Sequence, residues 1–213
     1  MKFRRKSDDA PTEAQVEADA AEAAAALSSG PFDIDDLPDH DEVQRVDLGS
    51  MLVAPADGLE LRLQVDEDEE AVQAVVLAGP DGALELRAFA APRNGDLWSE
   101  IRPRLAADYA QRGGTATERE GRFGTELLCE LTVRTQDGRT GTQASRVIGV
   151  NGSRWMLRAT LLGRPAQDPA SAGTWEDAIE KIVVRRGAQA MPVGAALPLT
   201  MPPREQLVER PNP

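Results

Sequence analysis

Two turn signals within residues 125–162 constrain the fold more than any other feature of the sequence. The pairs Asp137-Gly138 and Asn151-Gly152 favour type I′ turns, because both central residues of such a turn need positive φ. Each pair is flanked by residues that alternate between apolar and polar, as in half-buried strands. The sequence therefore predicts three antiparallel strands joined by two two-residue loops.

These loops also set the pairing of the strands. The second turn places Ile148 opposite Trp155, and the first places Cys129 opposite Arg146. A one-residue slip would move every side chain of a strand to the other face of the sheet, so register decides what is buried. Both turns predict one apolar face made of Leu127, Cys129, Leu131, Val133, Ile148, Trp155, Leu157, Ala159 and Leu161.

Further strands are expected before this meander, at residues 50–54, 59–65, 71–78 and 83–90. The loop Gly79–Gly82 between the last two would bring Leu77 opposite Leu84. Helical spacing of apolar residues predicts a long helix at Asp96–Arg112 and a short one that begins at Thr174. The sequence thus predicts an α+β domain, an antiparallel sheet of five to seven strands with both helices on its apolar face.

Composition separates this domain, at residues 43–187, from two tails. Residues 1–42 hold twelve acidic and four basic residues and few large apolar ones, which is typical of a disordered segment. Residues 188–213 are Pro-rich and are expected to be extended and mobile. The basic start (Lys2, Arg4, Arg5 and Lys6) could contact an anionic membrane surface, although no amphipathic helix follows it.

The residue types that most enzymes use are scarce. The single histidine, His40, lies in the acidic tail, and the single cysteine, Cys129, lies on the predicted apolar face. This pattern gives no Ser-His-Asp or Cys-His constellation, no zinc site of usual composition and no phosphate-binding glycine loop. We therefore expect a non-enzymatic protein without a cofactor or metal. One cysteine and no apolar run of membrane-spanning length favour the cytoplasm.

Arg146 is the residue most difficult to explain by packing alone, because both turns place it on the apolar face. A buried guanidinium must pair with an acid, extend to solvent or bind a ligand. On the opposite, mixed face, Glu130, Ser145 and Arg158 are predicted to form a row across three strands, as a surface ion pair would. Arg146, Glu130 and Arg158 are therefore the candidate contacts for a ligand or partner.

Several stretches resemble an uncharacterised actinobacterial family, a conserved domain of unknown function, over about residues 46–191. They are Val46–Ser50, Leu86–Arg93, Phe123–Glu126, Asp137–Thr142 and Arg154–Arg158. This resemblance implies no activity and no catalytic residues. The order of strands, helix, meander and short helix also resembles the Mog1/PsbP-like fold, whose members mostly bind other proteins. That likeness would place helices on both faces of the sheet.

Two functional hypotheses follow. The first is a cytoplasmic protein-interaction or scaffold module, since site chemistry is missing and the tails suit partner capture. The alternative is a binder of a small anionic ligand or lipid headgroup, organised by Arg146. Nucleic acid is a poor fit, because residues 43–213 are nearly neutral and hold no platform of interleaved basic and aromatic residues.

Overall fold

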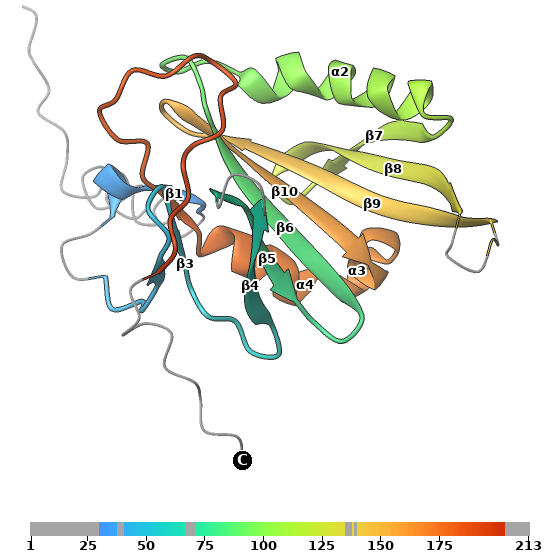
Figure 1. Ribbon diagram of the computed structural model, residues 1–213, viewed down its shortest axis with the longest axis horizontal. Helices are drawn as coiled ribbons and strands as arrows, with labels where there is room; N and C mark the ends of the chain where they lie inside the picture. The colour runs from blue at the N-terminus through green and yellow to red at the C-terminus, as the bar shows by residue number, and fades with distance from the viewer. Residues whose placement is uncertain (1–29, 38–40, 67–70, 135–137, 139, 203–213) are drawn as a thin grey trace, which may run out of the picture.

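The computed structural model describes residues 30–37, 41–66, 71–134, 138 and 140–202. They form an α+β structure with a seven-stranded antiparallel sheet, a four-stranded mixed sheet and a 15-residue helix (Figure 1). The predicted fold class is confirmed. Of the helices in this part of the chain, none combines the length and hydrophobicity that a bilayer-spanning segment needs.

The large sheet has the order β4-β5-β6-β10-β9-β8-β7. Leu77 pairs with Leu84 across the β5–β6 hairpin, as predicted. Strand β7 was not predicted from the sequence, because its exposed residues are mostly polar. The strands are β4 (Glu60–Asp66), β5 (Ala71–Ala78), β6 (Gly82–Ala90), β7 (Thr115–Gly121), β8 (Gly124–Arg134), β9 (Thr140–Asn151) and β10 (Trp155–Gly163).

The predicted register between β8 and β9 is wrong by one residue. Leu128, not Cys129, lies opposite Arg146. Since side chains alternate, the slip reverses the faces of β8: Leu127 and Cys129 pack in a different cluster from Ile148 and Trp155. The turn on which the prediction rested includes Asp137, which lies outside the described residues.

The predicted type I′ turn at Asn151-Gly152 is also wrong. Asn151 is the last residue of β9, and neither residue has positive φ. The chain turns one step later, where the Gly152 amide donates to the Trp155 carbonyl at 2.8 Å. The pairing of β9 with β10 shifts by four residues, so Leu157 lies opposite Val150. Because this shift is even, the faces of β9 and β10 are as predicted.

The helices cover both faces of the large sheet, not one. Helix α2 (Leu97–Gln111) packs with Leu127, Cys129, Val147 and Met156, which we call the α2 face (Figure 1). Helix α4 (Gly173–Glu180) packs through Trp175, Ala178 and Ile179 on the other side, the α4 face, with Ile148, Trp155, Leu157 and Leu161. Short helices α3 (Arg164–Gln167) and η2 (Pro169–Ser171), which were not predicted from the sequence, precede α4.

A four-stranded sheet, which the sequence did not indicate, adds to the α4 face. Its order is β1-β11-β3-β2, and only β1 and β11 run parallel. Met51 and Val53 of β3 contribute to the same core as Trp155. The strands are β1 (Phe32–Asp33), β2 (Val46–Asp47), β3 (Met51–Val53) and β11 (Val183–Val184), and helix η1 (Ile34–Asp36) follows β1.

Both ends of the described chain pack on this core. Asp33 is buried and accepts hydrogen bonds from Trp155 Nε1 at 2.9 Å and Ser153 Oγ at 2.7 Å. Packed contacts therefore begin before residue 43, where the sequence placed the domain boundary. The basic start of the acidic tail lies outside the described residues.

The described C-terminal residues also differ from the mobile tail that we expected. The Leu197 amide donates to the Ala88 carbonyl at 2.8 Å, and Leu197 is buried. Leu199 forms β-bridges with both Gly49 and Val72. This segment therefore joins the large sheet to the turn between β2 and β3. The prolines of this segment do not prevent docking, because residues between them, Gly194, Leu197 and Thr200, donate backbone hydrogen bonds to the rest of the structure.

Candidate functional site

Arg146 lies on β9, on the α4 face, and its side chain is 2% exposed. Its Nε donates to Glu126 Oε2 on β8 at 2.7 Å, and its Nη2 donates to Glu176 on α4. Arg146 points to a helix-covered face, as predicted, and of the alternatives left open by the sequence its guanidinium pairs with acids. The one-residue shift of β8 is what brings Glu126 to this face.

The pair belongs to a larger ionic network. Glu126 Oε1 accepts from Arg119 Nε at 2.9 Å and Nη2 at 2.6 Å. Arg122 contacts Asp177 at 2.7 Å and Glu180 at 2.7 Å. Including Glu176, three arginines and four carboxylates tie β7, β8 and β9 to α4. The carboxylates exceed the guanidiniums, so the network supplies no excess positive charge for an anionic ligand.

Glu130 and Arg158 lie on opposite faces of the sheet, so the predicted row across three strands is wrong. Glu130 is exposed opposite Ala144, on the α4 face, and lines a cleft of about 500 Å³ beside Gln167. Arg158 lies on the α2 face, and its nearest acid is Glu85, at 3.6 Å. The reversed face of β8 is the physical reason for this separation.

Cys129 and Ser145 lie opposite each other in the β8–β9 register, on the face covered by α2. Tyr109 Oη lies 3.0 Å from Ser145 Oγ. Cys129 is 1% exposed, and burial raises the pKa of its thiol to about 11. A thiol with such a pKa is almost entirely protonated at neutral pH and is a poor nucleophile.

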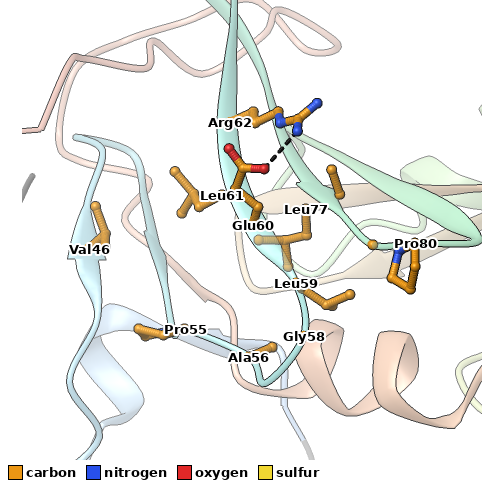
Figure 2. Close-up of a pocket in the computed structure, with 12 residues that line it drawn as sticks. Val46, Pro55, Ala56, Gly58, Leu59, Glu60, Leu61, Arg62, Leu77 and Pro80 are labelled. Carbon is orange, nitrogen blue, oxygen red and sulfur yellow. Dashed lines mark hydrogen bonds and ion pairs between the residues drawn. The ribbon is translucent and has the colours of Figure 1, made fainter. Parts of the chain in front are cut away.

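A hollow of about 670 Å³ lies between the two sheets (Figure 2). Val46 of β2 lies on one side, Leu61 of β4 on the other, and Leu59 at the end near Gly58. The Glu60–Arg62 pair, with 2.6 Å between its charged atoms, is exposed at the rim, and its hydrogen bond lowers the pKa of Glu60. The remaining lining residues are Pro55, Ala56, Leu77, Ala78, Gly79 and Pro80. We call this hollow the inter-sheet groove.

One strand edge borders this groove. In the described part of the chain, β4 ends the large sheet and has a neighbouring strand on one side only. A strand at the edge of a sheet presents main-chain N–H and C=O groups that can pair with a further strand. The groove thus offers an apolar floor beside unpaired backbone.

Sequence reasoning missed this groove because it depends on contacts between distant segments. The strand pattern of residues 59–65 predicted β4, and Pro55 marked the end of β3. Nothing in either pattern shows that the two strands belong to different sheets. The C-terminal segment that joins those sheets carries only a Pro-rich signal.

Among the described residues, no three His, Cys, Asp or Glu side chains are arranged to hold a metal ion. Comparison with known families gives a clear match. A family described as "Protein of unknown function (DUF3710)" matches residues 30–207, and the chain belongs to this family. The match includes the segment that begins with β1 and most of the C-terminal segment. No curated protein matches the chain.

Proposed function

We propose that this chain is a protein-binding module that holds an extended, apolar segment of a partner protein in the inter-sheet groove. The observation that carries the proposal is the coincidence of an apolar floor with an open strand edge at β4. Strand addition to such an edge is a recurrent way to bind peptides, in which backbone hydrogen bonds give affinity and side-chain pockets give specificity.

The groove sets the chemistry of the partner. Alternate side chains of an added strand would point toward Leu59 and Leu61, so they should be apolar and of moderate size. The Glu60–Arg62 pair at the rim is neutral in sum and adds no strong preference for charge. Affinity should come mainly from apolar burial and main-chain pairing.

Other features point in the same direction. The predicted order of strands and helices resembles that of Mog1/PsbP-like domains, whose members mostly bind other proteins, and this analogy favours a binding role over catalysis. The cytoplasm as the place of action, an actinobacterial origin and the absence of catalysis remain parts of this proposal. The free, buried Cys129 suits a reducing compartment.

The test compares two alanine-to-glutamate variants of the full chain. Ala56→Glu puts a charge into the groove, and Ala83→Glu puts the same charge on the α2 face, at another partly buried alanine. Peptides selected from a random display library on the wild-type protein are then measured against all three proteins. Thermal unfolding of each variant checks that both remain folded.

We expect selected peptides with alternating apolar residues whose affinity falls at least about tenfold in Ala56→Glu, equivalent to about 1.4 kcal/mol. Ala83→Glu should bind as the wild type does. Pull-downs from the native host should show the same dependence for a stoichiometric partner. Equal binding by Ala56→Glu and the wild type would show that the groove is not the binding site.

A further inference from the structure

A second cationic feature lies away from both the groove and the Arg146 network. Arg87 of β6 and Arg158 of β10 are directly opposite each other in the sheet register. They belong to the α2 face, because Arg158 lies opposite Gly149 while Arg146 and Ile148 point to the other side. Helix α2 packs mainly over β7, β8 and β9 (Figure 1), and only Tyr109, near its end, comes close enough to Arg158 to influence the pKa of that guanidinium.

One aromatic ring holds both guanidinium groups. The guanidinium carbon of Arg87 lies 5.7 Å from the centre of the Phe89 ring, and that of Arg158 lies 5.3 Å from it. Cation–π attraction fixes these groups at a common place without using their N–H donors. The donors therefore stay available in the plane of each guanidinium.

The two arginines have too few acidic neighbours to balance their positive charges. Arg158 has Glu85 at 3.6 Å, which is longer than a charge-assisted hydrogen bond. Arg87 makes no ion pair with any described residue. Two guanidiniums and one carboxylate leave a surplus of one positive charge. A like-charged pair on one ring is unfavourable in the free protein and is relieved by a bound anion.

Burial makes this surplus of positive charge more costly. The Nε atoms of Arg87 and Arg158 are both buried and have no hydrogen-bond partner among the described residues. Burial, and then the charge of Arg87, lower the pKa of Arg158. The Arg158 side chain is still 22% exposed, so a small ligand can reach it.

We propose that Arg87 and Arg158 form a binding site for a compact oxyanion of the phosphate type. Each guanidinium offers parallel N–H donors that match the spacing of two oxygens on one phosphorus. A phosphate group has enough oxygens and charge to accept from both arginines at once, whereas a carboxylate has two oxygens and one charge. Free phosphate and a phosphorylated small molecule or side chain share this chemistry.

The charge of the rest of the protein limits the ligand to a small one. Most of the net charge of −12 belongs to residues 1–42, and the nearly neutral remainder of the chain offers no broad positive surface to a long polyanion such as nucleic acid. A single phosphate group gains the local attraction of the arginine pair and meets little of the distant negative charge, because salt screens interactions over about 8–10 Å.

The experiment is a titration of the full chain, labelled with ¹⁵N, with inorganic phosphate at constant ionic strength. The Nε–H signals of Arg87 and Arg158 report on the site directly and do not depend on stability. O-phosphoserine and acetate are titrated in parallel. The variants are Arg87→Gln, Arg158→Gln and Arg87→Lys, and Arg164→Gln is the control, since Arg164 is an exposed arginine with acids at 3.8 and 4.0 Å.

We expect saturable shifts of both signals, with a dissociation constant on the order of 1 mM. Affinity should fall at least about tenfold in both Gln variants and also in Arg87→Lys, which keeps the charge but loses the planar fork. Arg164→Gln and Ala56→Glu should bind phosphate as the wild type does, which separates this site from the groove. Binding of O-phosphoserine but not free phosphate would assign the site to phosphorylated molecules.

Three results would overturn the proposal. The first is a shift that grows linearly with phosphate and does not saturate. The second is equal affinity in the wild type and both Gln variants. The third is acetate binding as tight as phosphate binding, which would show general attraction of anions and no preference for phosphate.

Discussion

Replacing Arg146 with methionine should destabilise the protein by about 3 kcal/mol, although methionine fits an apolar site. The variant leaves Glu126, whose side chain is 1% exposed, without the partner of its Oε2 atom. Breaking a buried ion pair by removing one member costs about 3–5 kcal/mol. We take the lower end because Arg119 keeps two bonds to Oε1, and because Glu176, at 15% exposure, reaches solvent.

A double variant separates the cost of leaving the Glu126 carboxylate unpaired from the cost of lost packing. Arg146→Met combined with Glu126→Leu removes both charges, and such apolar replacements are often neutral or stabilising. We expect the double variant to lie within about 1 kcal/mol of the wild type. Urea unfolding, followed by tryptophan fluorescence and circular dichroism, gives the free energies of unfolding of the wild type, Arg146→Met, Glu126→Leu and the double variant. A single variant as stable as the wild type, or two additive losses, would refute the reasoning.

Three further predictions concern the core. Asp33→Ala should cost about 2 kcal/mol, because the buried Trp155 indole loses its acceptor, and an unchanged urea midpoint would contradict this. Gly149→Ala should cost about 2–3 kcal/mol, because a Cβ there would lie 2.1 Å from the Trp98 ring, and the urea midpoint should fall accordingly. For Cys129, the pKa of the thiol is raised in the folded state to about 11, so the folded state favours the protonated form. Stability relative to Cys129→Ala should therefore be constant below about pH 8.5 and fall by about 1.4 kcal/mol per pH unit between about pH 9 and 11. A flat difference across that range would contradict it.

Local patterns predicted the elements whose partners are close in sequence. The β5–β6 hairpin and α2 follow from turn residues and apolar spacing, and Asp96 caps α2 by accepting from the Ser99 amide at 3.0 Å. The prediction of a turn at Asn151-Gly152 is wrong because the Asn151 side chain has another role. Asn151 Oδ1 accepts from the Trp98 amide at 3.1 Å and so supports the start of α2. A turn propensity cannot reveal a contact 53 positions away.

The candidate site was predictable only in part, for the same reason. The alternation of apolar and polar residues predicted that Arg146 lies on a covered face. This prediction is confirmed because the observed β9–β10 pairing differs from the predicted one by an even number of residues. Its partner Glu126 was not predicted, because the predicted β8–β9 pairing was wrong by one residue and reversed the faces of β8. The Arg87–Arg158 pair needed the pairing of β6 with β10, which no hairpin turn specifies.

The parallel pairing of β1 with β11 has a consequence for how the chain folds during synthesis. Phe32 pairs with Val183, about 150 positions later in the chain, while most neighbours in the large sheet are joined by short loops. Hairpins can therefore form as they leave the ribosome, but the small sheet must wait for almost the whole chain. Non-local pairing of this kind slows folding and leaves apolar surface uncovered meanwhile. During translation the α4 face is thus the apolar surface that stays uncovered until the small sheet, with Met51 and Val53, packs against it.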